Sequence, residues 1–123
     1  MKKGILVSLA AILLIASCSK SGGDGGGGNG GGGGGSVNCS GVASGFAATV
    51  NPIIQTTCAT DATCHGTGSA NGPGVLKTYT DIFSARVAIK TSVANGTMPK
   101  TGTLTTAQKN SIICWVDAGG PNN

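Results

Sequence analysis

Apolar side chains recur at helical spacing in three stretches after residue 45. Residues three or four apart share one face of an α-helix, so each stretch predicts a helix with one face turned inward. The three sets are Phe46, Val50, Ile53 and Ile54; Ile82, Phe83, Val87 and Ile89; and Ile112, Ile113, Trp115 and Val116. No stretch alternates apolar and polar residues as a half-buried strand would. The pattern predicts a small all-α domain with Trp115 packed in its core.

Breaking and capping residues give approximate ends for these helices. Pro52 lies inside the first stretch, so that helix either starts at about this position or is kinked there. We expect the second helix to run from 81 to about 94, with Thr80 as its N-cap. We expect the third to run from 106 to 117, because Thr105 can cap it and glycines follow it.

The N-terminus has the features of an export signal. Two lysines precede an apolar run over residues 4–16, which is shorter than the roughly 20 residues that a membrane-spanning helix needs. The run ends in Ile15-Ala16-Ser17-Cys18, which resembles the lipobox of bacterial lipoproteins. The resemblance implies that residues 1–17 are removed and that Cys18 is acylated. No aspartate follows Cys18, which in that family favours the outer membrane over the inner, on its periplasmic or cell-surface face.

Glycine dominates the segment that follows Cys18. Residues 18–36 contain a nearly unbroken glycine run from 22 to 35, which has no side chains to bury and predicts a flexible tether on the order of 20 to 25 Å long. Residues 37–123 remain for one small domain. They carry five basic and three acidic residues, and this weak, unclustered charge with few aromatic residues predicts no nucleic-acid binding.

The cysteines leave three interpretations open. The chain has five, and the lipid accounts for Cys18. In an exported protein the other four are expected to be oxidised or bound. They could form a covalent haem site with His65 plus one disulfide, two disulfides, or a zinc site that uses cysteines and His65. Zinc is the least favoured, because its ligands usually come in two separated pairs. The four cysteines are Cys39, Cys58, Cys64 and Cys114.

The stretch Cys-Ala-Thr-Asp-Ala-Thr-Cys-His, residues 58–65, has the order of residues that covalent haem attachment requires. In such sites two thiols join the porphyrin, and the histidine after the second cysteine ligates iron. The usual spacing is C-x-x-C-H, whereas here five residues separate Cys58 from Cys64. All five are small or polar, which predicts an exposed bulge, and residues 66–74 are expected to form a loop.

Met98 is the candidate for a second axial ligand. His65 is the only histidine, so one chain cannot supply two histidine ligands. Met1 leaves with the signal, and Met98 is then the only methionine. It lies in Asn-Gly-Thr-Met-Pro, residues 95–99, whereas a methionine that fills a core more often lies within a periodic helix. Histidine and methionine together are a known axial pair for haem iron.

From about residue 46 onward the chain resembles a single-haem cytochrome c domain. The resemblance rests on residues 52–58 leading into Cys64-His65-Gly66, on Gly96-Thr97-Met98-Pro99, on Leu104-Thr105 and on residues 115–123. It implies a helical domain wrapped around one covalent haem c. Cys58 and Cys64 would form the thioethers, and His65 and Met98 would ligate the iron. Related domains also carry a second cysteine pair, which implies a Cys39–Cys114 disulfide.

This resemblance implies one-electron transfer with redox protein partners, and the lipid would hold the domain at a membrane. The domain would be an electron carrier rather than an enzyme, since the chain lacks glutamate altogether and its aspartates show no pairing. One alternative is an accessory haem subunit of a larger oxidoreductase or extracellular cytochrome assembly, packed against other haem proteins or copies of itself. The other is a non-redox binding lipoprotein stapled by Cys58–Cys64 and Cys39–Cys114 disulfides.

Overall fold

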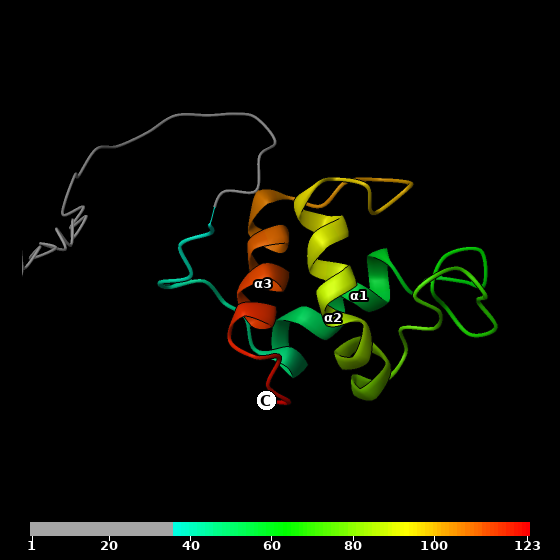
Figure 1. The fold of residues 1–123 in the computed structure, drawn as a ribbon, viewed down its shortest axis with the longest axis horizontal. Helices are drawn as coiled ribbons and strands as arrows, with labels where there is room; N and C mark the ends of the chain where they lie inside the picture. The colour runs from blue at the N-terminus through cyan, green and yellow to red at the C-terminus, as the bar shows by residue number, and fades with distance from the viewer. Residues whose placement is uncertain (1–35) are drawn as a thin grey trace, which may run out of the picture.

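The computed structural model describes residues 36–123, drawn in colour in Figure 1. Within this range the chain forms a π-helical turn η1 (Phe46–Val50) and three α-helices, α1 (Asn51–Thr57), α2 (Tyr79–Ala94) and α3 (Thr106–Asp117), with no β-strand. The predicted all-α fold is therefore confirmed. The predicted signal, Cys18 and the tether as far as residue 35 lie outside the described residues. No helix in the described part is long and apolar enough to cross a membrane.

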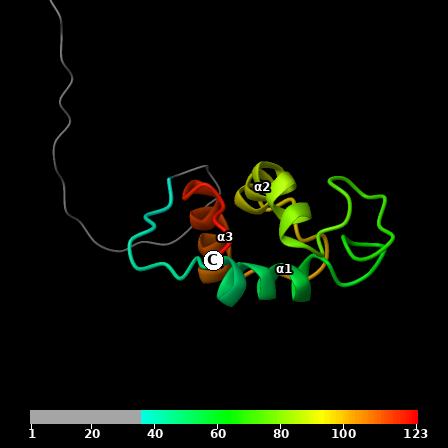
Figure 2. The same ribbon diagram turned by 90° about the horizontal axis from the view of Figure 1, so that it is seen from below.

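The helices form two layers. Helices α2 and α3 lie side by side and antiparallel, joined by the segment from 95 to 105 (Figure 1). Seen from below, α1 crosses one side of this pair (Figure 2). The turn η1 packs against α3, so the two ends of the domain meet. The connection from 58 to 78, here called the loop region, projects beyond the helices on the side away from α3 (Figures 1 and 2).

Aromatic residues join these layers in the core. Trp115 is fully buried, as predicted, and its Nε1–H donates to the carbonyl of Pro121 at 2.9 Å. The ring of Phe46 lies 5.5 Å from the Trp115 ring and 4.9 Å from the Tyr79 ring, in a nearly perpendicular arrangement with the latter. Such pairs contribute beyond the area they bury. The aromatic cluster therefore holds η1, the start of α2 and the end of α3 together.

The first helical stretch begins before its proline and changes type near it. The amides of Val50 and Asn51 bond to carbonyls five residues earlier, which gives the wide π-helical turn, and α-helical pairing begins at Asn51. Proline donates no N–H, so the regular bond pattern cannot pass through Pro52 unchanged. The structure thus resolves the two possibilities that the sequence left open, with a change of helix type at this position.

Helix α2 departs from the prediction in two respects. Its N-cap is Thr78 rather than Thr80, because Thr78 and Asp81 each bond the other's backbone amide in a reciprocal capping box. Val87, expected to point inward, is 65% exposed. It lies five positions after Ile82, which turns it about 140° from that residue around the helix axis. The buried face consists of Ile82, Ala85, Ile89 and Val93.

Helix α3 begins as predicted and anchors the N-terminal segment. Thr105 caps it in a second reciprocal box with Gln108. Its buried Cys114 forms a disulfide with Cys39, with 5.5 Å between the Cα atoms and 75 positions between the residues. This is the pairing that the cytochrome c resemblance implied. In the chain-entropy account, closing so long a loop adds about 4 kcal/mol to stability.

Candidate functional site

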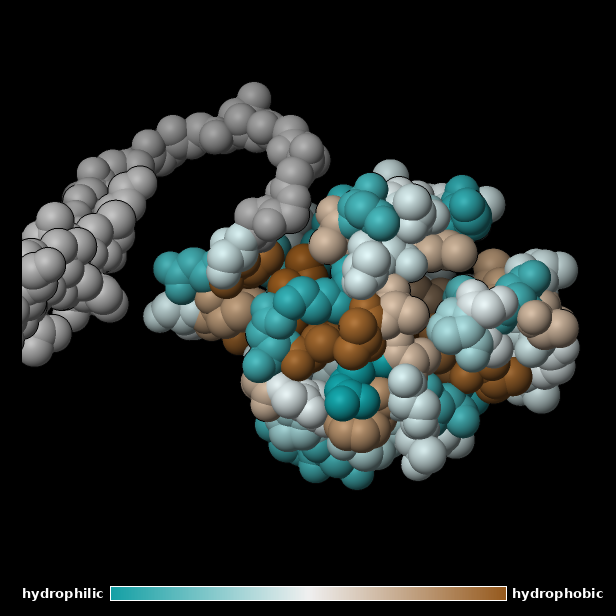
Figure 3. All heavy atoms as spheres, viewed as in Figure 1, coloured by the Kyte–Doolittle hydropathy of each residue, from teal (hydrophilic) through white to brown (hydrophobic). Residues whose placement is uncertain are grey.

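Two adjoining cavities lie between the loop region and the helices. The first has a volume of about 370 Å³ and the second about 320 Å³, and both are bounded by Cys58, His65, Gly72 and Met98. The surface is hollowed between the helices and the loop region (Figure 3). Together the cavities are large enough for a cofactor, since ligand sites in proteins commonly occupy about 300–1,000 Å³.

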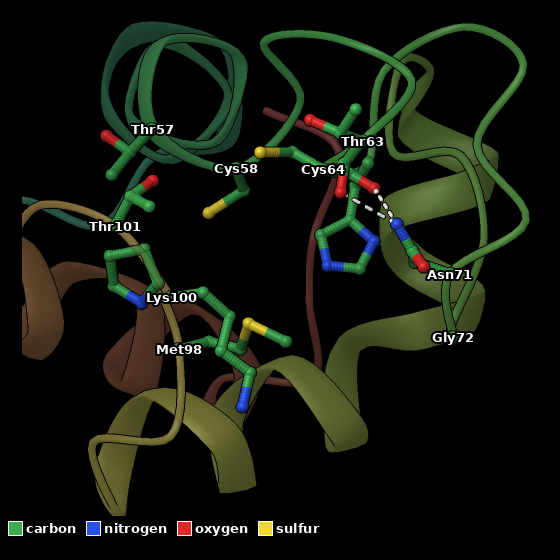
Figure 4. A pocket seen from close by; sticks show the side chains of 11 residues that line it. Thr57, Cys58, Thr63, Cys64, Asn71, Gly72, Met98, Lys100 and Thr101 are labelled. Carbon is green, nitrogen blue, oxygen red and sulfur yellow. Dashed lines mark hydrogen bonds between the residues drawn. The ribbon is translucent and has the colours of Figure 1, made fainter.

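The structure brings all four predicted haem-site residues to this place. Cys58, His65 and Met98 line both cavities, and Cys64 lines the first. Cys58 and Met98 point into the space from opposite sides, with Cys64 beside Cys58 (Figure 4). Neither Cys58 nor Cys64 forms a disulfide. Residues from the end of α1, from the loop region and from the segment after α2 thus converge on one cavity.

His65 is held with one nitrogen anchored. Its side chain is buried, and Nδ1 lies 3.0 Å from the carbonyl oxygen of Gly74. A carbonyl can only accept, so Nδ1 is the donor in this contact and Nε2 is the ring nitrogen left for another partner. A backbone carbonyl on the second nitrogen is the usual way in which a protein orients a metal-ligating histidine. The backbone is fixed as well, because the Leu76 amide donates to the His65 carbonyl at 2.8 Å.

The two thiols differ in their surroundings. Burial raises the pKa of the Cys58 thiol above its usual value, and the nearby Cys64 raises it further. Cys58 is therefore a neutral S–H group at neutral pH. Lys100 is the only charged side chain that lines the first cavity, and among the described residues no charged side chain lines the second. The thiols consequently face a nearly uncharged space.

Met98 is positioned by the turn that ends α2. Gly96 adopts a left-handed conformation with φ of 75°, as is common just after a helix. Asn95 accepts a bond from the Thr97 amide at 3.0 Å, and the Met98 amide donates back to Ser92 at 3.2 Å. The short turn thus returns the chain toward the loop region and places the thioether of Met98 at the cavities.

The five-residue spacer folds back on itself. Residues 60–63 are exposed, as predicted, whereas Ala59 is fully buried, contrary to the prediction of a bulge that includes it. Its amide bonds to the carbonyl of Ile54, so it continues the last turn of α1 into the core. The His65 amide donates to the carbonyl of Cys58 at 2.9 Å, which closes the spacer. The extra length therefore projects outward while its ends stay together.

Several residues of the site were not identified from the sequence. Asn71 donates to the carbonyls of Thr63 and Cys64 at 2.7 and 3.3 Å, which ties the spacer to the following loop (Figure 4). Asp61 accepts bonds within the spacer, and an aspartate in a loop is a known turn signal because its side chain can accept from the backbone amide two residues on. The aliphatic wall of the second cavity could not be assigned in advance, since it comes from Leu76, Ala88, Ile89 and Val93.

The disulfide argues against the zinc interpretation. Among the described residues, joining Cys39 to Cys114 leaves Cys58 and Cys64 as the free thiols near His65, one fewer than a Cys₃His site needs. Among residues 36–123 no group of three or more histidine, cysteine, aspartate or glutamate side chains is arranged to hold a metal ion.

Comparisons of the chain with protein-family models, curated proteins and solved structures gave no match. The argument for function therefore rests on the geometry of the site.

Proposed function

We propose that the protein is a membrane-tethered monohaem c-type cytochrome that transfers single electrons. The observation that carries the proposal is the convergence of Cys58, Cys64, His65 and Met98 on one pair of adjoining cavities. Cys58, Cys64 and His65 lie within one eight-residue stretch, whereas Met98 comes from 33 residues further along the chain. Each is of the chemical type that covalent haem binding needs at its position. A methionine that merely filled the core would not need to face a histidine and two free thiols.

The residues present fit a covalently bound haem. Cys58 and Cys64 would hold it through thioethers, and His65 and Met98 would be the axial ligands of its iron, which supplies a reversible one-electron couple when bound. The Gly74 carbonyl orients the His65 ring for this role. A thioether opposite a histidine stabilises the reduced state of iron relative to a histidine pair, so we expect a comparatively high reduction potential.

The aliphatic wall supports the same function. Leu76, Ile89 and Val93 are buried and line the second cavity, so they keep water from that side of the space. A water-poor surrounding reduces the reorganisation that a change of charge requires and raises the potential at which the iron accepts an electron. The first cavity, with a threonine-rich rim and Lys100, would give partners access to the cofactor.

The N-terminal sequence completes the proposal. We infer that Cys18 is lipidated and that the glycine-rich tether carries the domain at the outer membrane, facing the periplasm or the cell surface. A glycine-rich tether of this kind would let the domain turn toward different partners. The partners would be redox proteins, including other haem proteins or copies of the same chain.

The experiment that tests this function examines the axial ligands. The full chain is produced in a host with cytochrome c maturation and extracted in detergent, and its reduced and oxidised visible spectra are recorded. We expect a low-spin haem spectrum in the wild type and its loss in Met98→Ala, with covalent haem retained. Val87→Ala, a change at an exposed position of α2 away from the cavities, is the control and should leave the spectrum unchanged.

Two outcomes would argue against the proposal. A low-spin spectrum that persists in Met98→Ala would exclude Met98 as the axial ligand. A colourless wild type with Cys58 and Cys64 oxidised to a second disulfide would exclude the cytochrome altogether. The chain would then be the disulfide-stapled binding lipoprotein that the cysteine count also allows.

A further inference from the structure

We propose that Asp61 is the positioning residue that folds the five-residue spacer so that both Cys58 and Cys64 form thioethers to one haem. The inference rests on the proposed function and goes beyond it, because it concerns how a spacer longer than the usual two residues permits attachment through both thiols. It is carried by the hydrogen bonds within residues 58–66 and by the close packing of Gly66.

The carboxylate of Asp61 organises the second half of the spacer. Its Oδ1 accepts bonds from the Thr63 amide at 2.8 Å, from the Thr63 hydroxyl at 2.6 Å and from the Cys64 amide at 3.2 Å. Two of these donors are backbone amides that no helix or strand would satisfy. A carboxylate that accepts several such bonds fixes the turn in one conformation, as an N-cap fixes the first turn of a helix.

The backbone of Asp61 closes the same turn from the other side. Its carbonyl accepts from the Cys64 amide at 3.2 Å and from the Gly66 amide at 2.7 Å. A Cβ at Gly66 would meet the backbone of Asp61 at 2.7–2.8 Å, closer than carbon atoms approach in proteins. Only glycine therefore allows the chain beyond His65 to pass this close to Asp61.

These contacts determine where the two thiols and the His65 imidazole lie. The turn at Asp61 reverses the chain, and the His65 amide then reaches the Cys58 carbonyl at 2.9 Å. Asn71 holds the carbonyls of Thr63 and Cys64 from outside the turn. Without the Asp61 side chain, the Thr63 amide would lose its acceptor and the Cys64 amide would keep only the Asp61 carbonyl, so the spacer could adopt other conformations. Cys64 would then no longer be held beside Cys58.

Attachment through two thioethers requires the thiols of Cys58 and Cys64 to lie at the same haem. At each thioether the sulfur forms a bond to one carbon of a porphyrin vinyl group, the S–H hydrogen passes to the other, and the vinyl π bond is lost. No electrons enter or leave, so no oxidant or reductant is consumed. A displaced Cys64 leaves its vinyl group unreacted, which changes both the attachment pattern and the visible spectrum.

The test compares Asp61→Ala with Asp81→Ala in the full chain, produced with cytochrome c maturation. Asp81 is the matched control, since its carboxylate also accepts from a backbone amide, that of Thr78, but belongs to the capping box of α2. Peptide mass mapping gives the fraction of Cys64 that carries a thioether. We expect Asp61→Ala to lower the ratio of attached to unattached Cys64 about fivefold, the change in an equilibrium that corresponds to losing one cap. The reduced absorption band should shift to longer wavelength because of the remaining vinyl group. Asp81→Ala should match the wild type.

A second pair of variants tests the backbone contact. Gly66→Ala should also lower Cys64 attachment, because its Cβ displaces the Asp61 turn, whereas Gly45→Ala should not, since its Cβ would meet only Asn123 at 3.9 Å. Full attachment at Cys64 in Asp61→Ala would overturn the inference. Wild-type protein joined to haem through one cysteine alone would also overturn it, while leaving the cytochrome intact. Wild-type protein without covalent haem would instead refute the proposed function.

Discussion

The helical part and the loop region are stabilised in different ways. The helical part, defined as η1, α1, α2 and α3, buries aliphatic and aromatic side chains in a continuous core and has two reciprocal capping boxes. In the loop region the buried residues are Ala59, His65, Gly66 and Leu76, and most of the shape is set by hydrogen bonds to backbone groups. The core thus provides the stability, whereas the loop region places groups at the cavities.

This difference also affects how the side chains at the cavities are held in place. The thiols and the imidazole come from the loop region, where a conformation is set by turns such as that of Asp61, while Met98 follows directly from α2. A loop with few buried side chains gains little from apolar burial. It therefore depends more on polar contacts, and in the proposed holoprotein on the covalently bound haem, than the helices do.

The largest effect is expected from truncating the core. Trp115→Ala removes a fully buried ring that packs against Phe46 and donates to Pro121, and should cost about 3–5 kcal/mol in the free energy of unfolding. Asn71→Ala, in the loop region, should cost about 1 kcal/mol or less because it removes only side-chain hydrogen bonds. Denaturant unfolding of the two variants measures the contrast. Equal losses would show that the two regions are not stabilised differently.

Removing the disulfide should have the next largest effect. The double change Cys39→Ala and Cys114→Ala releases a link across 75 positions and should lower the free energy of unfolding by about 2–5 kcal/mol. The haem spectrum should be unchanged, because neither cysteine lines the cavities. An altered spectrum in a folded double variant would show that the disulfide shapes the site as well as stabilising the helices.

The smallest effect is expected in the dependence of stability on pH, through the carboxyl group of Asp81. The hydrogen bonds from Thr78 lower the pKa of Asp81 below its usual value. A carboxyl whose pKa is lower in the folded state stabilises the fold above its unfolded pKa, near 4, and this contribution is lost as the pH falls through the folded pKa. Asp81→Asn should therefore reduce the stability difference between about pH 6 and pH 2, measured by thermal unfolding. An unchanged difference would mean that the capping carboxylate is not perturbed.

How far the sequence predicted this structure depends on the range of the interactions involved. Local signals sufficed for α3, where Thr105 caps and glycines follow, and for the three helical stretches. They failed at Val87 and at Thr80, because burial depends on which face meets α3 and because two threonines can compete for one cap. Both errors concern positions where tertiary packing or a specific hydrogen-bond partner decides the outcome.

For the candidate site, too, local signals were sufficient and longer-range contacts could not be predicted. Cys58, His65 and Met98 could be selected because the chain has only five cysteines, one histidine and two methionines. The burial of Ala59 and the Asn71 contacts could not, since they depend on how residues 58–74 fold in three dimensions. Asp61 is a turn signal, but its hydrogen-bond partners could not be assigned in advance. The aliphatic wall likewise combines Leu76 of the loop region with Ala88, Ile89 and Val93 of α2, and the α2 residues lie far along the sequence from residues 58–65.

The most direct test of the central claim is the mass of the full chain under denaturing conditions, after production in a host with cytochrome c maturation. The account predicts a mass increased by one haem per chain, and no increase when both Cys58 and Cys64 are changed to alanine. Wild-type protein with no bound haem, its mass instead showing Cys58 and Cys64 joined in a second disulfide, would contradict the account.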